Sequence, residues 1–129
     1  MNNTNFIYEL QHGTAINLLD VTKIHMMKRN IPGIINSKSF LDELLMKKED
    51  KIYSVSFYFE IEYKDDIIVQ RSKNVIFSKY DSEDDIPSPP KDFQKYRVDI
   101  IDKWNKALQA KYLKKKNGHF QSTWKNKDE

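Results

Sequence analysis

The sequence contains no cysteine and only three glycines, and these shortages exclude several classes of protein. Without cysteine there is no disulfide framework, no thiol nucleophile and no cysteine-ligated zinc site. Three glycines leave no phosphate-binding glycine loop and no dinucleotide fingerprint. The three histidines, His12, His25 and His119, are far apart and lack H-x-x-x-H spacing. We therefore expect no catalytic residue, no metal and no cofactor.

Long apolar runs and arginine are scarce as well. No window approaches 18 uninterrupted apolar residues and the first residues carry no basic leader, so we expect neither a membrane span nor a signal peptide. With the lack of cysteine, this predicts a cytoplasmic protein, in the host cytoplasm if the source is viral. The basic residues are 19 lysines and 3 arginines, a bias typical of AT-rich genomes such as those of some bacteria, phages and mobile elements.

What is present predicts one folded domain. The 129 residues include 7 Phe, 7 Tyr and 2 Trp, too many aromatic side chains for a disordered chain, while 32% of residues are charged. A chain of this length supports one hydrophobic core. We expect a single domain over residues 1–129 with a highly charged surface.

The segment 51–63 shows the clearest periodicity in the chain. Large apolar residues alternate with Ser, Glu and one Tyr, which is the two-residue period of a strand with one buried face. Residues 64–66 then suit a tight turn, and a second strand begins at Ile67. Its apolar pattern is interrupted near Ser72, so the segment 51–80 predicts two to three antiparallel strands. A weaker alternation over residues 5–11 predicts a short N-terminal edge strand.

Three segments have the spacing of helices. Residues 15–29 place several apolar side chains near one face before Pro32 and Gly33, and residues 38–49 follow a serine N-cap with an apolar stripe. The longest helix is expected over 91–116 and is expected to end at Asn117 and Gly118. The predicted fold class is α+β: a small antiparallel sheet packed against a long C-terminal helix and one or two N-terminal helices.

The segment 81–90 and the C-terminal tail differ in composition from the rest. Residues 81–90 hold four acids and three prolines, which predicts a linker, although a loop that binds a cation or a basic partner is an alternative. Residues 118–129 form a tail with basic and aromatic side chains.

Three aromatic residues are candidates for contact with a partner protein. Phe120 and Trp124 lie beyond the expected helix end, where they either return to the hydrophobic core or anchor a partner, because Trp, Tyr and Phe dominate interfaces. Tyr58 lies among small and acidic residues on the outer face of the predicted strand.

The lysine-rich end is the candidate nucleic-acid-binding site. Residues 91–129 contain 11 basic and 5 acidic residues, a net charge of +6, and interleave lysines with aromatics as single-strand-binding surfaces do. The lysines concerned are Lys111, Lys114, Lys115, Lys116 and Lys125.

A third hypothesis is a metal-dependent nuclease. Glu62, Tyr63 and Lys64 match the acid-x-lysine element of such enzymes, with Asp50, Asp65 or Asp66 as further carboxylates, but these residue types are common. The leading hypothesis is therefore a small non-enzymatic protein that binds another macromolecule, most readily a protein, as an accessory or inhibitory factor. Nucleic-acid binding is the alternative, and the oligomeric state stays open.

Overall fold

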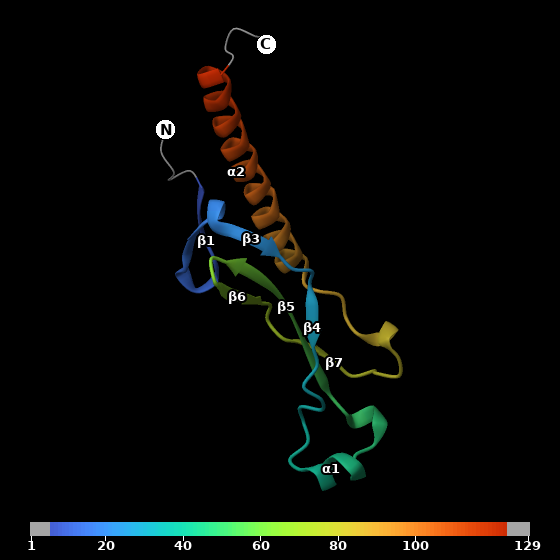
Figure 1. Cartoon of the computed structure of the whole chain (residues 1–129). Coiled ribbons are helices and arrows are strands. Elements are labelled where there is room, and N and C mark those ends of the chain that lie inside the picture. Colours follow the sequence, from blue (N-terminus) through green and yellow to red (C-terminus); the bar gives the residue numbers. More distant parts are fainter. Residues whose placement is uncertain (1–5, 124–129) are drawn as a thin grey trace.

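The computed structural model describes the backbone of residues 6–123 and the side chains of residues 6–113 (Figure 1). The elements form a five-stranded antiparallel sheet, a separate two-stranded sheet and one long helix. The strands are β1 (Ile7–Glu9), β2 (Ala15–Asn17), β3 (Val21–Ile24), β4 (Lys28–Asn30), β5 (Tyr53–Tyr63), β6 (Asp66–Arg71) and β7 (Val75–Phe77). The helices are α1 (Phe40–Leu45) and α2 (Lys91–Thr123), and single 3-10 turns include η3 (Leu18–Asp20), η4 (Lys48–Asp50) and η5 (Glu83–Asp85).

The strand β5 is the centre of the main sheet, as its alternating sequence predicts. Strands β3 and β4 pair with successive parts of one of its edges, and β6 and β7 pair with the other edge. The predicted interruption of the second strand is confirmed, because β6 ends at Arg71 and β7 begins at Val75. On β5 the side chains of Val55, Phe57, Phe59 and Ile61 are all buried.

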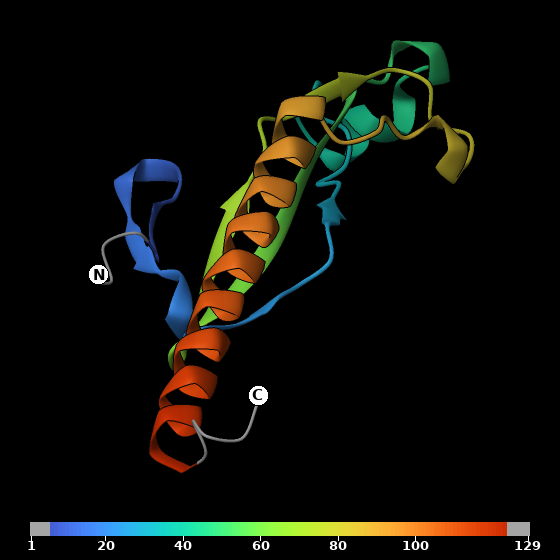
Figure 2. The ribbon, with the colours of Figure 1, turned by 90° about the horizontal axis from the view of Figure 1, so that it is seen from above.

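The helix α2 covers this apolar face of β5, and Figure 2 shows it lying along the strand. Phe93, Ile100 and Ala107 of α2 are buried in the same core, and the rings of Phe59 and Phe93 lie 5.5 Å apart. Trp104 packs at the margin, where its indole Nε1 donates a hydrogen bond to the carbonyl of Val21 at 3.2 Å. The predicted packing of the long helix on the central strand is therefore confirmed.

The predicted N-terminal helix over residues 15–29 is wrong. This segment forms β2, the turn η3, β3 and β4 instead. The Asn17 side chain accepts a hydrogen bond from Leu19 N at 3.0 Å and so caps a single turn, after which Val21 and Ile24 pair with β5. Pairing with the open edge of a long strand outweighs a weak helical periodicity, and β-branched residues fit that edge well.

The predicted fold class is corrected accordingly. Most elements are strands, and α2 is the only helix longer than six residues in the described part of the chain. The helix expected over 38–49 shrinks to α1 and does not cover the sheet. Figure 1 places α1 at the end of the molecule opposite the C-terminal end of α2.

The predicted end of the long helix is also wrong. The backbone stays helical through Asn117 and Gly118 as far as Thr123. A single glycine lowers the stability of an exposed helix by only about 1 kcal/mol, so Gly118 by itself does not end the helix. The last turns of α2 extend beyond the sheet (Figure 2).

The β1–β2 hairpin is fastened to the rest of the fold by polar side chains. Gln11 bonds to β6 as a strand would: its Nε2 donates to the carbonyl of Arg71 at 2.9 Å and its Oε1 accepts from Arg71 N at 3.0 Å. The Tyr8 hydroxyl donates to Asp99 of α2 at 2.7 Å. These contacts tie the hairpin both to the sheet edge and to the helix.

Candidate interaction site

The helix α1 is defined by a local polar cap. The Ser39 side chain accepts a hydrogen bond from Asp42 N at 3.1 Å, and Asp42 in turn accepts one from Lys38 N at 2.8 Å. The two acids of the first turn, Asp42 and Glu43, face the positive end of the helix dipole. The sequence leaves Ser37 and Ser39 open as N-caps; Ser39 takes this role, and Met46 ends the helix after six residues.

The apolar face of α1 points into solvent. Its four large hydrophobic side chains are between 62% and 75% exposed and occupy positions i, i+1, i+4 and i+5, which share one side of a helix. They are Phe40, Leu41, Leu44 and Leu45. The sequence predicted that this stripe would cover the sheet, and that prediction is wrong. A group of exposed large apolar side chains on so short an element is typical of a binding surface.

The segment that carries α1 is closed at its base by Asn36. Its Nδ2 donates to the carbonyl of Asp50 at 2.8 Å and its Oδ1 accepts from Ile52 N at 3.0 Å. Ile35 N also donates to the carbonyl of Ile52 at 2.8 Å. We call residues 36–50 the α1 loop. These hydrogen bonds hold the two ends of the α1 loop together, although the apolar residues of the loop are not packed in a core. They thereby fix the position of α1 relative to the sheet.

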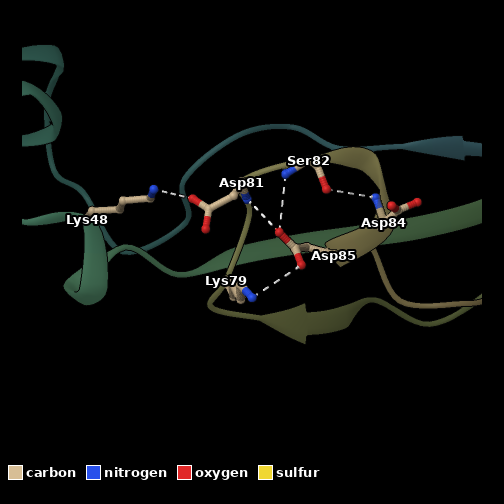
Figure 3. A network of polar contacts seen from close by, with 6 residues as sticks. All are labelled: Lys48, Lys79, Asp81, Ser82, Asp84 and Asp85. Atoms are coloured by element: carbon tan, nitrogen blue, oxygen red, sulfur yellow. Dashed lines mark hydrogen bonds and ion pairs between the residues drawn. The ribbon is translucent and has the colours of Figure 1, made fainter.

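The acidic segment 81–85 contacts the base of the α1 loop (Figure 3). Lys48 of η4 forms an ion pair with Asp81. Asp85 accepts hydrogen bonds from Asp81 N at 2.7 Å and Ser82 N at 3.2 Å, which completes a capping box around η5. These backbone hydrogen bonds, followed by the charge of Lys79, hold the pKa of the Asp85 carboxyl below its ordinary value.

The alternative role of this segment, binding a cation or a basic partner, gains no support from these contacts. Three of its four carboxylates contact the chain's own groups, since Glu83 also pairs with Arg29 at 3.0 Å. Among residues with described side chains, no group of three or more His, Asp or Glu residues is placed to hold a metal ion.

Tyr58 lies on the outer face of the sheet, where the sequence placed it. It is half-buried, because Arg71, its cross-strand neighbour on β6, places its guanidinium 5.4 Å from the centre of the tyrosine ring. Part of the aromatic face is therefore already occupied, so Tyr58 is a poorer anchor than the exposed residues of α1.

The proposed nuclease element is not assembled. The Oε2 of Glu62 lies within hydrogen-bonding distance, 2.7 Å, of the Nε2 of His25. Lys64 lies in the turn with a positive φ of 56°, with its ammonium over the Tyr63 ring. Asp50 lies at the opposite end of β5. Asp65 and Asp66 lie exposed beside Lys64 at the turn between β5 and β6. Among the described side chains they are not part of any group of three or more His, Asp or Glu residues that could hold a metal ion.

A hollow beside α2 has polar groups at its wall that bond to a buried side chain. A cavity of about 380 Å³ is bounded by Arg71, Lys73 and Tyr96, among others. The Tyr96 hydroxyl donates to the buried Gln70 side chain at 2.7 Å, and burial raises the pKa of Tyr96. The backbone N–H of Gln11 donates to both of these side chains, so they form one hydrogen-bonded group.

The remaining predicted residues lie toward the C-terminus. Lys111 is exposed on α2. Lys114, Lys115, Lys116 and Phe120 lie on the helical backbone, but their side chains are outside the described part of the structure, as are Trp124 and Lys125 entirely. The choice between a core and an interface role for Phe120 and Trp124 stays open.

Sequence reasoning missed the four exposed residues of α1 because an apolar stripe looks the same whether a core or a partner covers it.

No helix among the described residues has the length and apolar character needed to cross a bilayer. Comparison of the chain with protein-family models, curated proteins and solved structures found no match.

Proposed function

We propose that this chain is a small non-enzymatic protein that acts by binding another protein, as an accessory or inhibitory factor, through the exposed apolar face of α1. The observation that carries the proposal is the exposure of Phe40, Leu41, Leu44 and Leu45 on one side of a capped helix. A short amphipathic helix that enters an apolar groove is a common mode of protein recognition.

The energetics are adequate for such a contact. Complete burial of four fully exposed large apolar side chains is worth about 6 to 12 kcal/mol at the usual 1.5 to 3 kcal/mol each, and this is an upper bound here because each is already partly covered. Association costs at least about 4 kcal/mol in lost freedom. The hydrogen bonds of Asn36 reduce the further cost of ordering the α1 loop, because the loop is closed before the partner binds.

The α1 loop carries charges of both signs, with three lysines and four acids among residues 36–50. Its net charge therefore does not select the partner, and an apolar groove that takes the four exposed side chains of α1 fits this surface best. The cysteine-free sequence is compatible with action in a reducing compartment, which supports a cytoplasmic location, in the host cytoplasm if the source is viral.

The test compares three tagged proteins in extracts of the native cells, treated with nuclease. They are the wild type, the double variant Leu44→Asp/Leu45→Asp, and the control Ile67→Asp/Val69→Asp, which changes exposed aliphatic residues of β6. We expect wild type and control to retain the same protein and the α1 variant to retain at least about tenfold less, since two buried leucines are worth several kcal/mol.

Two results would contradict the proposal. Equal retention by all three proteins would place the interface elsewhere. Binding of wild type, but not the α1 variant, to anionic lipid vesicles without any retained protein would assign the apolar face to a membrane surface. Circular dichroism of each variant checks that the fold is kept.

A further inference from the structure

The long helix α2 carries a second apolar stripe that does not face the sheet. It recurs at alternating spacings of three and four residues along the helix. Val98 and Tyr112 are 60% and 62% exposed, Leu108 is 37% exposed and Ile101 is half-buried. The stripe consists of Val98, Ile101, Asn105, Leu108 and Tyr112. At 100° per residue it lies roughly 80 to 160° around the helix from Ile100, the centre of the buried face.

The spacing is that of the a and d positions of a coiled coil. Val98, Asn105 and Tyr112 take a positions, and Ile101 and Leu108 take d positions. A single asparagine at an a position, in the middle of an apolar seam, fixes the register and the number of strands in parallel two-helix assemblies. Asn105 is exposed in this chain. It is a polar residue at a position of the stripe where a residue packed in a core would be apolar.

The flanking charges distinguish between the two orientations of a helix pair. The guanidinium of Arg97, at a g position, is partly buried and donates through Nε and Nη2 to the carbonyl of His25. In a parallel pair its positive charge still comes close to the negative charge of Asp102 at the following e position of the other copy. In an antiparallel pair in the same register, Arg97 would meet Lys111, and their charges are alike. The Asp102 side chain is 58% exposed and forms an ion pair with the neighbouring Lys106 at 3.2 Å, so it is accessible from outside.

We infer that the second stripe of α2 binds a second copy of this chain in a parallel helix pair, with Asn105 facing Asn105 across the seam. The seam from Val98 to Tyr112 is about 21 Å long at 1.5 Å per residue. So short a contact forms a weak dimer that depends on protein concentration.

A parallel pair has a consequence for the binding site. Because α1 lies at the end of the molecule opposite the C-terminal end of α2, the twofold axis along the helices brings both α1 loops to the same end of the dimer (Figure 1). Two α1 surfaces then become available to a partner with repeated sites, which raises the apparent affinity without a new contact. The dimer itself does not depend on the function proposed for α1.

Sedimentation equilibrium of the full chain tests self-association over roughly 5 to 500 µM, the range in which weak dimers dissociate. We expect the wild type to shift from monomer to dimer within this range and Leu108→Glu to stay monomeric. Asn105→Leu should associate at least about tenfold more tightly, since an apolar residue replaces a polar one in the seam. Ile76→Glu, on β7, is the control and should behave as the wild type.

Orientation is tested by single cysteines, which the cysteine-free chain makes unambiguous. Oxidation should link Val98→Cys into a disulfide dimer, because a parallel pair brings the two copies of position 98 together, and should not link Lys95→Cys on another side of the helix. The inference is overturned if the wild type stays monomeric throughout, if Leu108→Glu dimerises as well as the wild type, or if Val98→Cys links no faster than Lys95→Cys.

Discussion

The side-chain oxygen of Asn36 accepts a hydrogen bond from the backbone N–H of Ile52 at 3.0 Å. The same side chain donates to the carbonyl of Asp50, so one amide joins the two ends of the α1 loop where the loop enters and leaves the sheet. The Lys48–Asp81 ion pair adds a second attachment from η5. An exposed apolar helix is therefore held in place by polar contacts at its base and not by a core.

We predict that Asn36→Ala loosens the α1 loop without unfolding the domain. Its two hydrogen bonds lie at the surface, so the free energy of unfolding should fall by about 1 kcal/mol or less. Amide hydrogen exchange should become faster over residues 36–52 and stay unchanged at Phe59. Unchanged exchange across the α1 loop would show that Asn36 does not hold it.

The core between β5 and α2 should be the main source of stability. Phe59 is fully buried against Phe93 and Tyr96, so Phe59→Ala should lower the free energy of unfolding by about 3 to 5 kcal/mol. Tyr58→Ala, its neighbour on the outer face, should cost about 1 kcal/mol or less. Urea unfolding compares the two, and equal losses would contradict the assigned faces of β5.

The contact between Tyr8 and Asp99 should make stability depend on pH. The Tyr8 hydroxyl, followed by Lys103, holds the pKa of Asp99 below its ordinary value. A lowered pKa in the folded state stabilises the fold above about pH 4, and this contribution is lost as the pH falls further. It is small, well under about 1 kcal/mol, because Asp99 is partly exposed.

Alkaline pH should act on the same pair with the opposite sign. Burial, followed by the contact with Asp99, raises the pKa of Tyr8, so this stabilising contribution is present below about pH 10 and is lost above it. Tyr8→Phe should therefore flatten the dependence of the unfolding free energy on pH at both ends. Urea titrations at several pH values measure this, and identical profiles for the two proteins would rule the contact out.

Nucleic-acid binding by the lysine-rich end makes a separate prediction. Binding to single-stranded DNA or RNA should weaken steeply from low to physiological salt. It should disappear when the chain is truncated after Ala110, which removes all five candidate lysines. The α1 proposal predicts instead that partner binding survives this truncation. Fluorescence anisotropy with a labelled oligonucleotide separates the two roles.

The sequence predicted the parts of the fold that have a strong local period. The alternation over β5 and the recurrence of Phe93, Tyr96 and Ile100 are long enough to define both the type and the buried face of each element. These two elements contact each other, so the part of the core between β5 and α2 could be predicted from the sequence, while the part supplied by Leu10, Ile16, Leu18 and Val21 could not.

The remainder depends on contacts that no local pattern records. Residues 15–29 form strands because β5 has an open edge for Val21 and Ile24, which the segment itself does not reveal. The apolar stripe of α1 was assigned to the core because hydrophobic spacing defines a face without saying what covers it. The candidate interaction site was missed for the same reason.

Site-specific crosslinking in the native cells tests the role of α1 most directly. A photoreactive amino acid at Leu45, 75% exposed on α1, is compared with the same group at Ile67, 58% exposed on β6. We predict one prominent adduct with another protein from position 45 and none from position 67, with the adduct lost when Leu41→Asp is added. Equal adducts from both positions, or an adduct from position 67 alone, would contradict the assignment of the binding surface to α1.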